Sequence, residues 1–417
     1  MSRSAQREGT PVDRRRFLGI AGAGAAALAA GCDFSLSDGI LNACHAGVPP
    51  HLRTHALVAA AWRDIDAHNV WDAHCHVFGN GDSGQGLWIN PAMERIWSPA
   101  QYVQRLFYMN AGCAHDTPGR IDDSVVDRLL NQCEAMPEGF RALLFAFDWA
   151  RDDAGSPMPE RSTFYVPDAY AAGLARRHSD RFEWAASVHP YAPDARDRLD
   201  AAKARGARAV KWLPSAQNID PASPRCDRFY DKLVDLKLPL ITHAGDERAV
   251  QGHGEHLGNP LLLRRPLDAG VRVVVAHCAS LGMGRDLDNG GTALVPNFDL
   301  FTRLMDEPRP RANLRGDISA VTQGNRMDVV EVLLARRDWH ARLLNGSDYP
   351  LPGILPLVSL PALVARGLLD PNAAAPLREL RNHNTLLFDF VLKRSLARHG
   401  AGFAPSVFET RTYFAAT

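Results

Sequence analysis

The sequence predicts an α/β chain folded as a (β/α)8 TIM barrel with an insertion after strand one. Short apolar runs alternate with amphipathic helical segments, which is the pattern of parallel βαβ units. Most of the runs also end on an ionisable residue, as strands that carry an active site do. The runs number eight: residues 69–78, 140–150, 182–191, 207–214, 238–245, 271–280, 312–320 and 341–350.

The segments between the runs support this fold class. Amphipathic helices are expected at residues 167–181, 193–207 and 326–338. An open, doubly wound sheet is the alternative for such a strand count, but no G-x-G-x-x-G turn follows the first run. Residues 79–135, which contain Gly, Trp and Pro, read as a long insertion that could cover the site. One barrel domain is therefore expected.

The overall composition excludes several classes of protein. Of the 417 residues, 46% are hydrophobic and 23% are charged, as in soluble globular proteins. Lys and Arg together number 47, and so do Asp and Glu, so no basic excess favours nucleic acid as a partner. A small-molecule substrate is expected instead.

The N-terminus has the pattern of an export signal. Arg14, Arg15 and Arg16 precede Phe17-Leu18 and a run of small and apolar residues, an order that resembles a twin-arginine (Tat) signal. The apolar run, residues 17–30, is shorter than the ~20 residues of a membrane-spanning helix; a membrane anchor or amphipathic helix is the alternative. We expect a signal peptide over 1–31 and a periplasmic protein.

The same region leaves open how the mature protein is held. Cys32 follows Ala29-Ala30-Gly31, which resembles a lipoprotein cleavage box, so membrane anchoring through a lipidated Cys32 and a homodimer are both open. A disulfide between Cys113 and Cys133 is compatible with an oxidising periplasm, but spacing alone does not decide the pairing. The expected organisation is a tether and lead-in over 32–66, the barrel over 67–395 and a C-terminal tail over 396–417.

Ionisable residues stand at the ends of the expected strands. In a barrel these ends meet at one face, where active sites lie, whereas buried parallel strands are otherwise rich in Val, Ile and Leu. A single such residue would be an ordinary hydrogen-bonded core residue, but several at corresponding positions indicate a site. They are His74, His76, Lys211, His243, His277 and Asp348.

The first run, "WDAHCH", indicates a metal site. Side chains alternate along a strand, so His74 and His76 point into the barrel while Cys75 points toward the helices. Asp72 shares the inward direction one layer deeper, where it is expected to orient a ligand histidine. Imidazole and carboxylate are ligands that zinc prefers.

These motifs together resemble the amidohydrolase superfamily. "DAHCH", "KWLP", "THAGDE", "AHCAS", "GDISA" and "NGSDYP" follow one another on the expected strands, and the resemblance covers about residues 67 to 390. It is strongest to the amidohydrolase-2 branch, which includes aminocarboxymuconate-semialdehyde decarboxylase. The resemblance implies one divalent metal ion, zinc foremost, with Mn, Fe or Co as alternatives. It implies four metal ligands: His74, His76, His243 and Asp348. It also implies His277 as a general base or an electrophile beside the metal-bound water, with His277 and Asp348 as the catalytic residues that move the proton of this water.

Other candidates keep alternative interpretations. In binuclear members of the family a lysine at the position of Lys211 is carboxylated and bridges two metals; a substrate-binding or a structural role is the alternative. Arg315 could bind an anionic substrate group or pair with Asp317. His189 could touch substrate or be a satisfied core residue. Four residues after the fifth strand could line the pocket or be solvated: Asp246, Glu247, His253 and His256.

The resulting hypothesis is a metal-dependent hydrolase of a small amide, ester or lactone. A decarboxylase of an unsaturated or aromatic carboxylic acid, built on the same site, is the first alternative. A non-catalytic barrel that binds a metal or ligand is the second. Substrate identity rests on loops that carry no decodable motif.

Overall fold

The computed structural model describes residues 36–114, 117–252, 254–308 and 312–415. The expected signal peptide, Cys32 and His253 lie outside these ranges. Within them, no helix is both long and apolar enough to cross a membrane.

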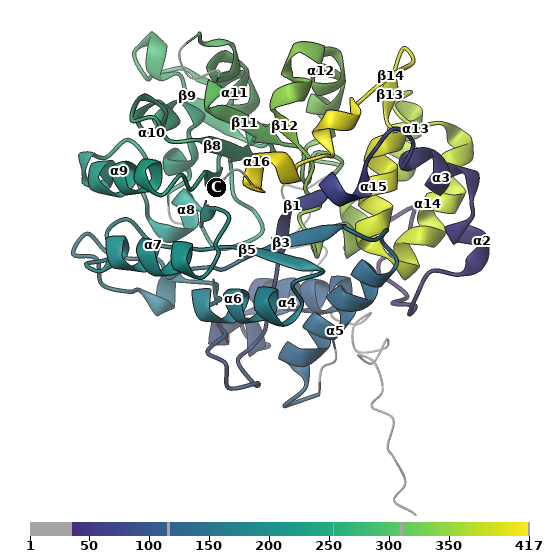
Figure 1. The fold of residues 1–417 in the computed structure, drawn as a ribbon, viewed down its shortest axis with the longest axis horizontal. Helices are drawn as coiled ribbons and strands as arrows, with labels where there is room; N and C mark the ends of the chain where they lie inside the picture. The colour runs from purple at the N-terminus through teal and green to yellow at the C-terminus, as the bar shows by residue number, and fades with distance from the viewer. Residues whose placement is uncertain (1–35, 115–116, 253, 309–311, 416–417) are drawn as a thin grey trace, which may run out of the picture.

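A barrel of eight parallel strands forms the centre of the molecule, and each strand lies inside one of the expected apolar runs (Figure 1). They pair as two parallel sheets, in the orders β1-β3-β5 and β12-β11-β8-β7-β6. The strands are β1 (Trp71–His76), β3 (Arg141–Phe145), β5 (Phe182–Ala185), β6 (Val210–Trp212), β7 (Leu240–His243), β8 (Val273–Ala276), β11 (Leu314–Asp317) and β12 (Leu343–Leu344).

Backbone hydrogen bonds join the two sheets at both junctions. Between β5 and β6, the Lys211 amide donates to the Ala186 carbonyl at 2.7 Å, beside a parallel bridge of Ala186 with Val210. After β12, the Asp348 amide donates to the His74 carbonyl at 2.8 Å. The predicted (β/α)8 fold is therefore confirmed.

Helices surround the strands and connect them in sequence (Figure 1). Their apolar residues pack on the outside of the barrel in one continuous core. The helices are α6 (Asp168–Arg177), α7 (Ala195–Ala204), α8 (Pro214–Gln217), α9 (Asp227–Asp235), α10 (Arg264–Asp268), α11 (Asn297–Asp306), α12 (Val330–Ala335), α13 (Leu360–Ala365), α14 (Pro371–His383) and α15 (Thr385–Ser395).

The insertion after β1 contributes α4 (Pro99–Ala111), α5 (Ile121–Glu134) and the short strand β2 (Trp88–Ile89), which pairs with β4 (Phe164–Tyr165). Two helices of the lead-in, α2 (Pro50–Arg53) and α3 (Ala56–Ala61), precede β1. Elsewhere, β9 (Met283–Arg285) pairs with β10 (Leu294–Pro296), and β13 (Ala397–Arg398) with β14 (Ala401–Gly402). The insertion expected after strand one is thus present, with two helices and a short strand that belongs to a separate two-stranded sheet.

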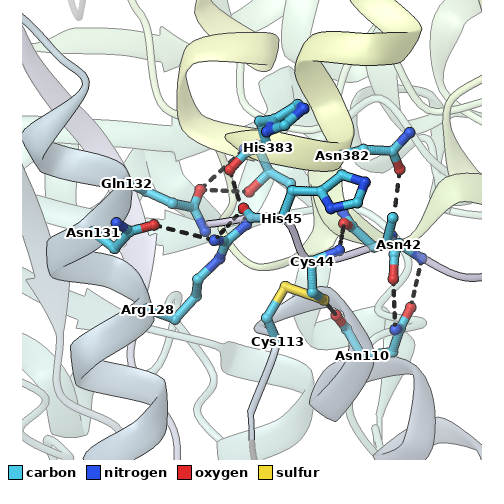
Figure 2. The surroundings of a disulfide bond; sticks show 12 residues. Asn42, Cys44, His45, Asn110, Cys113, Arg128, Asn131, Gln132, Asn382 and His383 are labelled. Atoms are coloured by element: carbon cyan, nitrogen blue, oxygen red, sulfur yellow. Dashed lines mark hydrogen bonds between the residues drawn. A yellow bond between two sulfur atoms is a disulfide. The ribbon is translucent and has the colours of Figure 1, made fainter. Parts of the chain in front are cut away.

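A disulfide ties the lead-in to the insertion. Cys44 bonds Cys113, just beyond the end of α4, and Figure 2 shows Asn42 and Asn110 bonded to each other beside it. On the other side of the bridge, Arg128 donates to the carbonyls of His45 and His383, both at 2.9 Å. The expected partner Cys133 is instead a free, buried thiol, because it lies inside α5 and packs in the core.

The chain's last helix closes the amino end of the barrel. Tyr413 and Phe414 of α16 (Arg411–Ala415) pack with side chains that point inward from the strands, among them Trp71, Ile241 and Val274. In Figure 1, α16 lies in the middle of the ring of strands. The segment expected as a tail therefore completes the interior core.

Candidate active site

Three ligand atoms converge at the carboxyl end of the barrel. The Nε2 atoms of His74 and His76, on β1, lie 3.2 Å apart. Oδ1 of Asp348, just after β12, lies 3.4 Å from His74 Nε2 and 3.3 Å from His76 Nε2. His74 and Asp348 are buried, and His76 is partly exposed. The sequence-predicted alternation along β1 thus places both imidazoles on one side.

This triangle has the dimensions of a metal site. Bonds of about 2.0–2.1 Å around a tetrahedral zinc place neighbouring ligand atoms roughly 3.3–3.4 Å apart. The three distances, 3.2, 3.3 and 3.4 Å, match that spacing. The same three residues form one of the two groups of the described chain whose ligand atoms lie within 4.8 Å of one another. Two imidazoles and a carboxylate therefore fit a divalent ion.

Asp317 fixes the orientation of His74. Its Oδ2 accepts from His74 Nδ1 at 2.8 Å, which leaves the Nε2 lone pair directed at His76 and Asp348. Burial alone would raise the pKa of Asp317, but the charge and hydrogen bond of His74 outweigh it and hold that pKa below its ordinary value. Asp317 is therefore an acceptor suited to a metal-ligating histidine.

Asp72, which was expected to orient a ligand histidine, bonds backbone amides instead. Its Oδ1 accepts the backbone amides of His74 at 3.1 Å and Ser347 at 2.7 Å. Burial raises the pKa of Asp72 to about 6, although bonds from Ser347 oppose the rise. The carboxylate thus fixes the backbones of β1 and the segment before Asp348, because it reaches amides rather than an imidazole ring.

His277 lies beside the triangle, directly after β8. Its ring centroid is 4.8 Å from that of His74 and 5.2 Å from that of His243. Nδ1 lies 2.8 Å from Ser319 Oγ and 3.2 Å from the Ser319 carbonyl. Since a carbonyl only accepts, Nδ1 carries the proton and Nε2 is the basic nitrogen. Burial lowers the pKa of His277 well below its ordinary value.

Two of the converging residues have left-handed backbones. The φ of His277 is 55° and that of Asp348 is 60°. Non-glycine residues rarely adopt this conformation, and it concentrates where surrounding structure fixes a functional side chain. Burial would raise the pKa of Asp348, but His277, His76 and His74 hold it well below its ordinary value. Asp348 is therefore an ionised carboxylate.

His243, the expected fourth ligand, lies in the same cavity but is otherwise bonded. Its Nδ1 lies 3.3 Å from Glu247 Oε2, and its Nε2 lies 3.3 Å from the Asp246 carbonyl. Neither of the two ligand groups of the described chain includes it. Its role as a metal ligand stays a prediction, which requires one ring nitrogen to leave its present partner.

Lys211 lies at the floor of the cavity. Its Nζ is buried without a hydrogen-bond partner among the described residues and lies 5.1 Å from the centroid of the Phe145 ring. Burial lowers the pKa of Lys211 to about 8, although Asp317 and Asp348 oppose the shift. The position of Lys211 suits either a carboxylated lysine that bridges two metals or a residue that binds the substrate.

Arg315 does not reach the cavity. Its side chain points to the amino end of the barrel, where it lies 4.3 Å from the centroid of the Tyr413 ring. The expected pairing with Asp317 is likewise absent: the two residues share one face of β11, but Arg315 extends to the Tyr413 ring at the amino end while Asp317 bonds His74 at the carboxyl end. Arg315 therefore contacts neither Asp317 nor the site.

His189 and the residues of the loop after β7 differ in their burial and contacts. His189 is buried and satisfied, since its Nε2 lies 2.8 Å from the Gln217 carbonyl and its Nδ1 accepts the Tyr191 amide at 3.1 Å. Glu247 lines the cavity, whereas His256 is exposed. The core interpretation of His189 is thus the one that the contacts support.

The residues of the site line a cavity of about 190 Å³. Apolar side chains form much of its wall, and α4 of the insertion contributes Gln104, Phe107 and Tyr108, as expected of a covering segment. The other apolar lining residues come from strands and loops: Val77, Phe78, Phe145, Phe147, Phe164, Val166, Leu213, Ala249, Val250, Leu281, Pro350, Leu351, Ile354 and Leu357.

Sequence reasoning missed three features of this site. Asp317 orients His74, Ser319 contacts His277, and Arg326 lines the cavity. A signal for the first two exists, because Asp317 and Ser319 in "GDISA" share the inward parity at a strand end. Arg326 lies in the loop that follows, where no such periodicity applies.

Several solved structures are similar to this chain at low sequence identity. No protein of the curated collection matches the sequence. Similar solved structures include an uncharacterized TIM-barrel protein of Bordetella bronchiseptica (15% identity, 75% of this chain and 99% of that one, TM-score 0.44). Others are a probable 2-pyrone-4,6-dicarboxylic acid hydrolase of Acinetobacter baumannii (15%, 77% and 99%, 0.41) and the 5-carboxyvanillate decarboxylase of Sphingomonas paucimobilis (12%, 74% and 95%, 0.41).

A family model described as amidohydrolase matches residues 71–353, from the first residue of β1 to just beyond Asp348. The match spans more than half of the chain and includes every strand of the barrel. The protein therefore belongs to the amidohydrolase family, in its amidohydrolase-2 branch, and is an enzyme of that family.

Proposed function

We propose that the protein is a metal-dependent hydrolase of a small ester, lactone or amide. The observation that carries this proposal is the triangle of His74 Nε2, His76 Nε2 and Asp348 Oδ1, 3.2–3.4 Å on a side, with His277 beside it. These three residues would hold one divalent ion, and zinc suits their nitrogen and oxygen atoms best. When bound by these residues, such an ion would polarise a substrate carbonyl and would lower the pKa of a bound water toward ~7.

His277 supplies the proton transfers. Because its Nδ1–H is held by Ser319, its Nε2 accepts a proton from the attacking water and returns it to the leaving group. Burial keeps the imidazole neutral at pH 7, as a proton acceptor must be. Asp317 holds both neighbours in register, since it accepts from the His74 ring and from the His277 amide at 2.9 Å.

A decarboxylase is the second candidate, and Lys211 favours it. Its Nζ lies at the floor of the cavity without a hydrogen-bond partner among the described residues. Such a cation would pair with the carboxylate of an acid substrate. The two proposed reactions would use the same metal-binding residues but give different products, so the release of carbon dioxide distinguishes decarboxylation from hydrolysis.

The test is an activity panel with product analysis. Metal-loaded protein is assayed against esters, lactones, amides and aromatic or unsaturated carboxylic acids, with chelator-stripped protein as the control. Metal-dependent hydrolysis without carbon dioxide is the expected outcome. Carbon dioxide release would establish the decarboxylase instead, and metal-loaded protein that turns over none of the panel would favour a non-catalytic binding barrel.

We further propose that the chain is exported through a twin-arginine route to the periplasm. The order Arg14-Arg15-Arg16-Phe17-Leu18 supports this proposal, as does the disulfide of Cys44 with Cys113, since such bonds persist in oxidising compartments. Changing Arg14 and Arg15 to Lys should leave the protein in the cytoplasm, which cell fractionation measures. Continued export of that variant contradicts the route.

Cys32→Ala should release a lipidated protein from the membrane fraction and leave an unlipidated one unchanged.

A further inference from the structure

Lys393 is a fully buried cation near the end of α15. Every residue of this helix from Thr385 to Lys393 is buried, and the exposed fraction of Lys393 is 0%. Lysine is almost never fully buried unless it is paired. In Figure 1, α15 lies outside the ring of strands, and Lys393 does not line the cavity. The groups that it bonds therefore indicate its role.

Lys393 donates to two oxygen atoms of the described chain. Its Nζ lies 2.7 Å from Oδ2 of Asp389, one helical turn earlier, and 2.7 Å from the carbonyl oxygen of Gly346. Asp389 is buried as well. A buried ion pair carries a desolvation cost, and apolar residues of similar volume often give a protein at least equal stability. Packing alone therefore does not account for this pair.

The carbonyl of Gly346 and the amide of Ser347 belong to one peptide group, and this group is held at both ends. Lys393 donates to its oxygen at 2.7 Å, and Asp72 Oδ1 accepts from its N–H at 2.7 Å. Both hydrogen bonds are charge-assisted, so they are stronger than bonds between neutral groups. The peptide group that precedes the Ser347 side chain is therefore fixed between a cation and a carboxylate.

This peptide group leads directly into Asp348, the acid of the triangle. Asp348 has a φ of 60°, and its amide donates to the His74 carbonyl at 2.8 Å. A left-handed backbone at a non-glycine residue persists where surrounding contacts fix it. Gly346 permits the close approach to β1, because an added Cβ would lie 2.5 Å from the Cβ of His74. The direction of the Asp348 carboxylate thus depends on a backbone that Lys393 bonds.

We propose that Lys393 is a positioning residue for the metal ligand Asp348. Through the Gly346 carbonyl it holds the backbone that aims Asp348 at the two histidines of the triangle, and it thereby strengthens metal binding. Asp389 is its counter-ion. The proposal rests on the proposed function, in which Asp348 is a metal ligand. It extends the site to a helix that follows the family match, which ends at residue 353.

The test measures metal affinity and stability on the same variants. Competition with a chromophoric chelator gives the zinc affinity of the full chain, and urea unfolding of the metal-free protein gives its stability. Lys393→Met leaves Asp389 buried without its cation and should unfold more easily. The double variant Lys393→Met with Asp389→Leu removes both charges at similar volume and should remain folded.

The double variant separates a positioning role from a structural one. Its zinc affinity should be roughly 10-fold weaker than that of unmodified protein, because loss of a group that orients a metal ligand costs about 10- to 100-fold in affinity. The absorption spectrum of its Co²⁺-loaded form should also differ from that of Co²⁺-loaded unmodified protein, since this spectrum reports ligand geometry. A purely structural role would change neither measurement in a folded variant.

Arg381→Met is the matched control. Arg381 is also fully buried, on α14, and it donates to the Val358 carbonyl at 3.0 Å rather than to the segment before Asp348. Asp38 keeps its bond from Arg378 in this variant, so no buried acid is left without a cation. The variant should lose stability but bind zinc as tightly as unmodified protein.

Two results would overturn the proposal alone. One is a folded double variant whose zinc affinity stays within about twofold of that of unmodified protein. The other is an equal loss of zinc affinity in Arg381→Met, which would make affinity follow stability. Unmodified protein that binds no zinc would instead refute the proposed function, and with it the premise of this proposal.

Discussion

The two ends of this barrel treat their arginines in opposite ways. At the amino end, Arg315 and Arg272 both lie over the Tyr413 ring, with guanidinium carbons 4.3 and 5.1 Å from its centroid. Arg272 also donates to the carbonyls of Tyr413 and Lys237. At the carboxyl end, Arg326 donates to Ser280 Oγ, and no carboxylate of the described chain lies within ion-pair distance of it.

The difference shows how one fold separates stability from function. The amino end is closed by α16, and its cations are compensated by protein groups, so nothing there requires a ligand. The carboxyl end places two imidazoles and a carboxylate within 3.4 Å of one another and leaves nearby cations unpaired. Loops after the strands carry chemistry in barrels of this class, and the opposite face carries stability.

The largest effect of breaking the carboxyl end is expected from His277→Asn. Asn keeps a polar side chain but cannot accept and return a proton, so turnover should fall by on the order of 10²- to 10⁴-fold. The metal content should be unchanged if the ion is held by the triangle, because His277 belongs instead to the second group of possible ligands, with His74 and Asp317. Steady-state kinetics and metal analysis on the same sample measure both. A near-normal rate would remove His277 from the mechanism.

The matching change at the amino end is Tyr413→Ala. Loss of this buried ring from the core under the strands should lower the free energy of unfolding by about 3 kcal/mol. Turnover at a temperature where the variant is folded should stay within about twofold. Tyr413→Phe keeps the ring under both arginines and is the control in urea unfolding. A large loss of turnover in folded Tyr413→Ala would contradict the separation of the two ends.

A smaller, pH-dependent effect is expected from His189, the satisfied histidine. Burial lowers its pKa from 6.5 to about 4 in the folded protein, although the Gln217 carbonyl opposes the shift. The unfolded chain binds a proton below pH 6.5 while the folded chain does not, so stability falls as pH falls from 6.5 toward 4. Between pH 7.5 and 5 this amounts to about 2 kcal/mol. Urea titrations of wild type and His189→Gln should differ by that much in pH dependence; identical dependence would contradict it.

The sequence predicts the barrel well because its strands are local apolar runs that need no knowledge of distant contacts. The same holds for His74 and His76, whose shared direction follows from strand alternation. The sequence does not identify the carboxylate that bonds the His74 ring, because the side chains of Asp72 and Asp317 are both expected to point into the barrel. Only the closed barrel shows that Asp317 reaches the imidazole and Asp72 reaches amides.

Long-range packing accounts for the remaining differences. Cys113 bonds Cys44 because the lead-in lies against the end of α4, a contact between segments that are 69 residues apart. Cysteine spacing carries no information about that contact. Arg326 and Tyr413 belong to a loop and a terminal helix, and their roles depend on which end of the barrel each one reaches.

Metal content tests the central claim most directly. Purified protein should contain about one divalent ion per chain by elemental analysis, and the double change His74→Ala with His76→Ala should lose it while the thermal unfolding transition remains cooperative. Tyr413→Phe, at the opposite end, should retain the ion. An unchanged metal content in the double variant would contradict the site at the carboxyl end of the barrel.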